Sequence, residues 1–589
     1  MLDKSTKEKI KIGFDVFLAC IGLISFVLFL IILGYELTDE QIKIIRIVIT
    51  FITIIFVFQE FARWFFRTNI IKYIKSRWFE NLLALLLMIE LFFPGLIIKL
   101  LILTNPDLTI KQATLLYLGI LNFIIMLALL IKILRYDYLL NKIKLQPGAI
   151  FALSFAFIII SGSLLLLLPN STPQGTSLSF IDSLFTSTSA VCVTGLIVVD
   201  TAKNFTLMGQ IIILMLIQVG GLGVMTLTTF FAMYLAGGVS FKVKIMMKDL
   251  LSQESLSEVR NLITRILIYT FVIEITGAII LYYSISGFKV FRWDYVFSSI
   301  FHAISAFCNA GFSVFSLNLM EPKLAGNYLY PSTIMMLIVF GGLGFAVLSN
   351  IANLRIRTNK IKQLKHRLTA SSKIVIITTL ILIFGGAIMI FLTEPFHFNN
   401  SFSTFDRFFH SLFLSITSRT AGYNTIPTEQ LTYASMIVVI LLMWIGASPG
   451  STGGGIKTTT ISLILLSLFN LMRGKDKVEV FKREIEPGTI KKAFMIMLSS
   501  LIFLGAGSFL LIWIEPDKQP LDLIFEATSA LGTVGLSRNL SWFLGTGGKV
   551  IIIILMYVGR IGVLTFFLLF VKSAIQPRYT LPKTEIMIG

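Results

Sequence analysis

A fourfold internal repeat constrains the fold of this chain more than any other feature of its sequence. From residue 149 onward, the chain passes four times through a long apolar helix, a short helix-sized run, a glycine-containing loop and a second apolar helix. The loop glycines stand in register at intervals of 116, 111 and 113 residues. They are Gly195, Gly311, Gly422 and Gly535. A period this regular predicts four copies of one structural unit.

The composition indicates that the main solvent of this chain is lipid. Hydrophobic residues make up 56% of the 589 positions and charged residues 14%, whereas a water-soluble chain carries about 25% charged residues. Apolar runs such as 150–169 and 331–351 are long enough to cross hydrocarbon at about 1.5 Å per residue. We therefore predict an all-α polytopic membrane protein embedded in a lipid bilayer.

The net charge of +19 reports the orientation of the chain rather than a nucleic-acid partner. The connector 355–367 holds six lysines and arginines and no acid, whereas the stretch 170–184 has no lysine or arginine. This asymmetry is typical of the positive-inside rule. It predicts cytoplasmic N- and C-termini in a cell membrane and no binding of nucleic acid.

Each loop follows a short run that is too short to span a membrane. These runs are about 10–13 residues long, as expected for re-entrant pore helices. Each has an acid at or near its start, which suits an N-cap or a first helical turn. The acids are Asp182, Asp294, Asp406 and Asp522.

The four loops are predicted to form an ion filter. Non-helical backbone is tolerated at membrane depth only where it is buried in protein or lines water, and a ring of carbonyl oxygens can replace the hydration shell of a cation. Residue types differ at one loop position (Cys192, Cys308, Arg419, Gly532), so backbone rather than side chains is the expected ligand. Isolated glycines commonly serve helix packing instead, but four in register favour the filter. The predicted filter residues are Cys192, Val193, Thr194, Gly195, Cys308, Asn309, Ala310, Gly311, Thr420, Ala421, Gly422, Gly532, Thr533, Val534 and Gly535.

At these residues the chain resembles the Trk/Ktr/HKT superfamily of potassium transporters, through the motifs AVCVTGL, FCNAGF, RTAGYNT, SPGSTGGGIKT and VGRIG. The resemblance covers residue 149 to the C-terminus. It implies four M1–pore–M2 units around one pathway, a homodimer and a cytosolic nucleotide-binding subunit of the RCK type. It also implies K⁺ as the transported ion, with no covalent cofactor and no metal other than potassium at the filter. Glycine at all four filter positions resembles the potassium-selective branch.

The resemblance also implies a gate below the filter. In the third unit, a glycine-rich run with Pro449 cannot sustain a helix, although a merely kinked helix is the alternative. Arg560 lies within the last apolar helix, where a charge is usually functional; it would hinder passage or hold the loop carbonyls, or else form a structural salt bridge. Glu526 would support the filter or place charge at the outer mouth. The predicted gate residues are Gly450, Ser451, Thr452, Gly453, Gly454, Gly455, Lys457 and Arg560.

Four further apolar segments precede the repeats, which brings the expected number of spanning helices to twelve. The stretch YIKSRWFENLLALLLM resembles part of a voltage-sensor domain, but the fourth segment lacks the regularly spaced arginines of a working sensor. The segments are 12–34, 44–61, 81–103 and 113–134. The expected domains are 1–148 (N-terminal four-helix region), 149–240, 241–355 and 356–475 (repeats one to three, the third with the gating loop), and 476–589 (repeat four and the C-terminus).

Potassium uptake competes with three other functions. The same architecture would suit a sodium or unselective cation transporter, or an ion-coupled symporter. A membrane enzyme would need clustered carboxylates, histidines or metal ligands. The four histidines are scattered, and His302 and His410 are expected to serve packing or hydrogen bonding. We therefore predict a transporter and not an enzyme.

Overall fold

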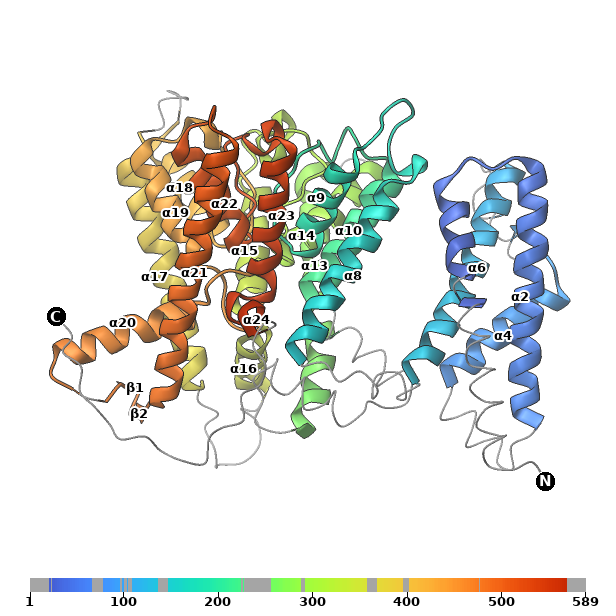
Figure 1. The fold of residues 1–589 in the computed structure, drawn as a ribbon, viewed down its shortest axis with the longest axis horizontal. Helices are drawn as coiled ribbons and strands as arrows, with labels where there is room; N and C mark the ends of the chain where they lie inside the picture. Colours follow the sequence, from blue (N-terminus) through green and yellow to red (C-terminus); the bar gives the residue numbers. More distant parts are fainter. Residues whose placement is uncertain are drawn as a thin grey trace.

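The computed structural model describes residues 21–22, 24–65, 78–95, 98–99, 103, 109–135, 147–223, 226, 256–287, 292–356, 368–395, 402–475 and 477–568. It is an all-α fold with a single short hairpin in these ranges (Figure 1). Within them, five helices are long and apolar enough to cross a membrane, or six if one bent pair is counted as a span. The expected number was twelve; breaks in the second helices and the gaps in the described ranges account for much of the difference.

Together with the helical residues 24–34, three N-terminal helices form a bundle beside the repeats (Figure 1). They are α2 (Asp39–Phe65), α4 (Trp78–Phe92) and α6 (Ile110–Arg135). They enclose a small apolar core of their own. The bundle touches the first repeat where Asn170 donates its amide to the carbonyl of Leu33 at 3.0 Å. Residues 12–20 and 23 of the first predicted segment lie outside the described ranges, and residues 24–34 are helical.

Each of the four units contains a first helix, a short helix and a second helix. The first helices are α8 (Pro147–Leu166), α13 (Leu256–Ser286), α17 (Ala370–Thr393) and α21 (Pro487–Ile514). The short helices are α9 (Phe180–Val191), α14 (Trp293–Phe307), α18 (Thr404–Thr417) and α22 (Pro520–Gly532). The second helices are α10 (Leu207–Leu222), α15 (Leu329–Leu343), α19 (Tyr433–Trp444) and α23 (Thr546–Ile561).

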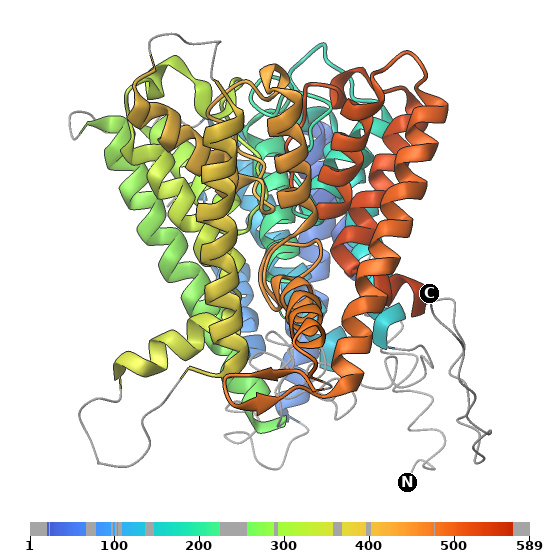
Figure 2. The ribbon, with the colours of Figure 1, turned by 90° about the vertical axis from the view of Figure 1, so that its left-hand side faces the viewer.

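Smaller elements complete the units. Helices α16 (Phe345–Ile356), α20 (Thr458–Met472) and α24 (Val563–Leu568) follow second helices, and α20 lies across the bundle axis at its lower end (Figures 1 and 2). Strands β1 (Glu479–Val480) and β2 (Arg483–Glu484) pair antiparallel near α20. The 3-10 turns are η1 (Pro169–Ser171), η2 (Asn318–Met320), η3 (Pro322–Leu324), η4 (Thr428–Gln430) and η5 (Ser541–Phe543).

The short helices begin as the sequence predicts. Asp182, Asp294, Asp406 and Asp522 each lie in the first turn of their helix. Ser403 and Asp406 form a complete capping box, in which each side chain binds the other residue's backbone N–H. The predicted acidic helix starts are therefore confirmed.

The second helix of every unit is interrupted, although the sequence predicts this only in the third unit. α10, α15 and α23 each end at a glycine with positive φ: Gly223, Gly344 and Gly562. α15 and α16 meet at an angle of 99° across Gly344. In the third unit, the longer segment 445–457 separates α19 from α20. The glycine clusters in the second helices thus mark breaks in all four units.

Candidate functional site: a ring of four loops

The chain turns sharply where each short helix ends. Two residues before each loop glycine, a residue with a side chain adopts positive φ: Val193 at 56°, Asn309 at 60°, Thr420 at 73° and Thr533 at 50°. The loop glycines Gly195, Gly311, Gly422 and Gly535 also have positive φ. Because this conformation is strained for residues other than glycine, its occurrence in four equivalent turns indicates a shared structural requirement.

The four loops meet in a closed ring. A Cβ atom added to Gly195 would lie within 2.6 Å of the carbonyl oxygen of Ala310, the residue before the next loop glycine. The same holds for Gly311 toward Ala421, Gly422 toward Val534 and Gly535 toward Thr194. The units therefore surround one axis in sequence order, and only glycine permits this approach of backbones. We call residues 192–195, 308–311, 419–422 and 532–535 the loop ring.

A hydroxyl near the end of each short helix holds the loop that follows. Ser189 and Ser529 accept from the backbone N–H of Gly195 and Gly535 at 3.0 and 3.1 Å. In the other two units, Ser305 donates to the carbonyl of Phe312 at 2.9 Å and Thr417 donates to that of Tyr423 at 2.7 Å. These residues were not among the predicted site residues, although a serine or threonine stands five or six positions before every loop glycine.

Side chains of the ring contact neighbouring protein groups. The Asn309 amide donates to Thr420 Oγ1 at 3.1 Å, and Thr533 Oγ1 accepts from the backbone N–H of Gly454 at 3.1 Å. Cys192 and Cys308 are buried free thiols. These contacts engage the polar side chains of Asn309, Thr420 and Thr533 within the protein, whereas the buried Thr194 hydroxyl has no hydrogen-bond partner in the described ranges. Backbone carbonyls, which all four loops share, remain the ring's main candidate ligands.

Segment 445–457 of the third unit packs against the ring and against the break in α15. Thr452 Oγ1 donates to the carbonyl of Phe307, the last residue of α14, at 3.1 Å. The backbone N–H of Ser448 donates to Gly342 at 3.0 Å, and that of Phe345 donates to Gly450 at 3.0 Å. A Cβ atom on Gly453 would clash with the Thr420 side chain. The predicted gate residues Gly450–Gly455 thus lie next to the ring.

Two partly buried cations contact carbonyl oxygens of this segment, and one of them, Lys457, lies within the segment itself. Lys457 donates from Nζ to the carbonyl of Gly453 at 2.7 Å. Arg560 donates from its two terminal nitrogens to the carbonyls of Thr452 and Gly220. No acidic side chain among the described residues pairs with Arg560. Its partners are therefore backbone oxygens of the third and first units.

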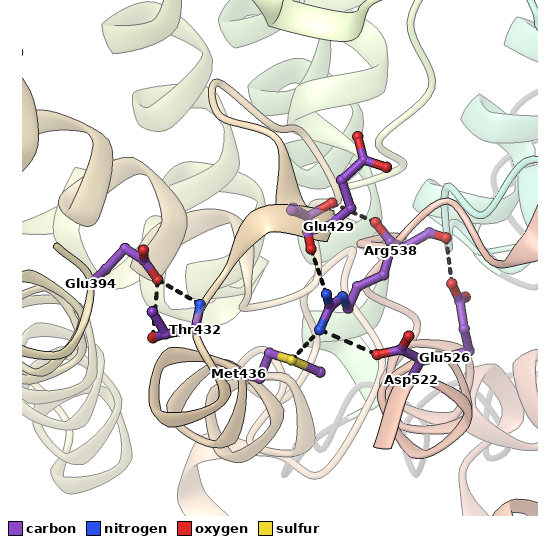
Figure 3. Close-up of polar contacts among 9 residues, drawn as sticks. Glu394, Glu429, Thr432, Met436, Asp522, Glu526 and Arg538 are labelled. Carbon is purple, nitrogen blue, oxygen red and sulfur yellow. Dashed lines mark hydrogen bonds and ion pairs between the residues drawn. The ribbon is translucent and has the colours of Figure 1, made fainter. Parts of the chain in front are cut away.

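Glu526 of α22 supports the chain that follows the fourth loop (Figure 3). This carboxylate is fully buried and accepts from the hydroxyls of Ser537 and Ser541, the latter at 2.9 Å. Nearby, Arg538 pairs with Asp522 at 3.2 Å and also donates to the carbonyl of Glu429 in the third unit. Of the two roles considered for Glu526, this geometry favours support of the loop.

The histidines in the short helices are engaged in hydrogen bonds. Nδ1 of His302 lies 2.7 Å from the carbonyl of Ser298, and Nε2 lies 2.8 Å from Ser313 Oγ. Nδ1 of His410 lies 2.9 Å from Thr425 Oγ1. Both are therefore placed for packing and hydrogen bonding. No group of three metal-ligating side chains occurs in the described ranges.

Acids at the starts of the short helices also link different units. Asp182 of the first unit pairs with Lys549 of the fourth at 2.6 Å. Asp406 of the third unit accepts from the hydroxyl of Tyr328 in the second. The sequence predicts the caps but not these links, because the partners are 367 and 78 residues apart.

The fold and the loop ring together define a class of protein: a multi-pass membrane protein with four re-entrant units around one axis. A family model described as TrkH, cation transport protein, matches residues 120–581. The chain therefore belongs to this family of the Trk/Ktr superfamily, which confirms the resemblance seen in the sequence. The family consists of transporters and not of enzymes.

Individual relatives agree with this assignment. The chain is 37% identical over 453 residues to the potassium/sodium uptake protein NtpJ of Enterococcus hirae. The aligned region covers 76% of this chain and 98% of that protein. It is 36% identical over 463 residues to the Ktr system potassium uptake protein B of Bacillus subtilis, spanning 77% and 100%. The potassium transporter TrkH from Vibrio parahaemolyticus shares the fold, with a TM-score of 0.60 at 17% identity over 85% of this chain and 98% of that one.

Proposed function

We propose that this chain mediates K⁺ uptake across the cytoplasmic membrane, with the loop ring as its selectivity filter. The observation that carries the proposal is the closed ring of glycine-to-carbonyl contacts between successive units. Such a ring presents backbone oxygens to a dehydrated cation, and the C-terminal ends of four short helices add partial negative charge beside it. The names of the relatives as potassium uptake proteins support the choice of ion.

The proposed gate is segment 445–457. Its contacts with Phe307, Thr420 and Thr533 place it next to the ring. Arg560 holds it there from the fourth unit, and Lys457 braces it from within. We propose that a cytosolic RCK-type nucleotide-binding subunit displaces this segment and that the transporter assembles as a homodimer. The name "Ktr system" of several relatives agrees with more than one component.

The proposed orientation follows from the basic connectors. Helix α16, which ends at the first residues of the connector 355–367, lies at the opposite end of the units from the starts of the short helices. The six basic residues of this connector support the proposal that this end faces the cytoplasm. The short helices then begin on the outer side, and the N- and C-termini are cytoplasmic.

Transport of both K⁺ and Na⁺ is the second candidate function. It is favoured by one relative, which is named a potassium/sodium uptake protein. The two candidates differ only in selectivity, because both use the same ring.

The test is uptake of K⁺ and Na⁺ by potassium-transport-deficient bacteria that express the chain with a candidate cytosolic partner. We compare wild type with Gly195→Ser, which adds a side chain against the carbonyl of Ala310. Gly175→Ser is the matched control, because Gly175 also has positive φ but nothing within 4 Å of an added Cβ atom. We expect Gly195→Ser to lower the K⁺/Na⁺ uptake ratio at least about tenfold, equivalent to about 1.4 kcal/mol, and Gly175→Ser to leave it unchanged.

Three results would count against the proposal. A well-expressed wild type that moves neither ion with several partners would contradict transport or show that the true partner is missing. Equal uptake of both ions by wild type would favour the second candidate function. An unchanged ratio in Gly195→Ser would remove Gly195 from the filter.

A further inference from the structure

A buried polar cluster between the first and second units breaks the fourfold pattern. Glu274 lies in the middle of the apolar stretch Ile263–Ser286 and is 4% exposed. Its carboxyl group accepts from the Gln218 amide of α10 at 3.3 Å and lies 3.9 Å from the sulfur of Cys308. Cys308 is in turn 3.7 Å from the Gln218 carbonyl oxygen. The three side chains form a closed triangle at membrane depth.

The other units show that the fold does not need a polar residue at this position. In each unit a glycine of the first helix closely approaches a leucine of the second helix: Gly162 and Leu216, Gly277 and Leu337, Gly386 and Leu442, and Gly507 and Leu555. Three residues before these glycines stand Ile159, Glu274, Ile383 and Leu504.

A second contact supports this alignment. Ser187 donates to the carbonyl of Ile159 at 2.6 Å, and Ser415 donates to that of Ile383 at 2.8 Å. A branched aliphatic side chain is therefore sufficient for packing at this position. The carboxylic acid of Glu274 must be explained by something other than the fold.

The surroundings favour the uncharged form of this acid. No lysine or arginine of the described residues forms an ion pair with Glu274. Cys308 faces it from the end of α14 and Gln218 from α10. Arg265, nine residues earlier on α13, is bound to Ser349 instead. An ionised carboxylate without a cationic partner is costly at membrane depth.

The cluster is directly connected to the loop ring. Cys308 is the C-cap of α14 and a ring residue, and it precedes Asn309, which has positive φ. The Cys308 sulfur lies against Gly221, where an added Cβ atom would approach to 2.5 Å. A shift of the Glu274 carboxyl group would therefore move the start of the second loop.

We propose that Glu274, as an uncharged carboxylic acid, is a positioning residue that acts with Gln218 to fix the second loop and thereby sets ion preference. This inference rests on the proposed filter function of the ring. The polar triangle ties the loop to two helices of different units, whereas an aliphatic residue would only fill space.

The test compares Glu274→Gln and Glu274→Leu in the uptake assay described above. Glutamine keeps the shape and the hydrogen bonding of an uncharged acid, and leucine reproduces the fourth unit. We expect Glu274→Gln to keep the wild-type K⁺/Na⁺ ratio. We expect Glu274→Leu to lower the ratio about three- to tenfold, the effect of losing a buried hydrogen bond. Ile383→Leu in the third unit is the control and should leave the ratio unchanged.

Each outcome decides the inference. Once the uptake of cells without the chain is subtracted for each ion, the ratio of the two ions does not depend on the amount of protein, so weaker expression of a variant does not imitate the effect. An unchanged ratio in Glu274→Leu would exclude the positioning role. A glutamine variant as impaired as the leucine variant would show that a charge is needed. If Gly195→Ser alters the ratio while Glu274→Leu does not, this inference fails and the proposed filter stands.

Discussion

At the scale of single residues, hydroxyls and cations hold the backbone of the loop ring and of segment 445–457. Lys457 binds a carbonyl within its own segment, whereas Arg560 binds carbonyls of the third and first units at once. An arginine within a membrane-spanning helix is costly unless its donors are used. We therefore propose that Arg560 keeps the segment in place.

Replacing Arg560 with glutamine removes both of these contacts. We expect K⁺ uptake without the cytosolic partner to rise at least about fivefold, because hydrogen bonds from a charged group each contribute about 1.5–3 kcal/mol. The measurement is uptake in cells that lack the partner gene. Arg265→Gln is the control, since Arg265 binds Ser349 and not the segment. Uptake that stays at background level in Arg560→Gln would argue against a role of this residue in keeping the segment in place.

At the scale of elements, two adjacent glycines in α17 distinguish the effect of helix packing on stability from the effect of helix propensity. A Cβ atom on Gly386 would meet Ser415 Oγ at 2.5 Å and Leu442 Cδ1 at 2.8 Å, but one on Gly385 would meet nothing within 4 Å. Gly386 therefore lets α17 lie close to both α18 and α19. Its neighbour has no such contact.

Alanine at these two positions should have opposite effects on stability. Gly386→Ala should destabilise the protein by about 1–3 kcal/mol through overpacking. Gly385→Ala should be neutral or stabilising by up to about 1 kcal/mol through helix propensity. Thermal unfolding in detergent checks both variants. Equal melting temperatures of the two variants would mean that α17 moves away from α18 and α19 at Gly386 at little cost.

The order of elements could be predicted because hydropathy and the repeat report it directly. The loop glycines could also be predicted, since a position that excludes a side chain leaves the same residue in all four copies. The partners of Arg560 and Glu274 could not, because they depend on which units become neighbours in space. Glycine clusters in the sequence mark the breaks at Gly223 and Gly562. Similar clusters also occur in continuous helices that pack closely, so these clusters alone do not predict a break.

At the scale of the whole molecule, a pair of charges closes the circle between the last unit and the first. The Asp182 and Lys549 side chains are 21% and 17% exposed, and their charged atoms are 2.6 Å apart. Of the ion pairs within the described ranges, this one joins the two most distant parts of the sequence. It stabilises the boundary between the fourth and the first unit, which the chain itself does not bridge.

A double-mutant cycle with Asp182→Asn and Lys549→Met measures this contribution. We expect each single variant to lower the melting temperature in detergent. The double variant should be less affected than the sum of the two, with a coupling energy of about 1 kcal/mol, because a hydrogen-bonded, largely buried pair exceeds an exposed one. Strictly additive effects would show that the pair does not couple the two units.

The glycine-to-carbonyl contacts of the ring have a consequence for how this transporter can change in evolution. Each loop glycine faces a backbone oxygen of the following unit, and the fourth faces the first. The ring thus has no free end at which the displacement caused by a new side chain could be absorbed. A lineage that replaces one of these glycines should therefore carry its compensating change in the next unit along the circle and not in the unit that mutated.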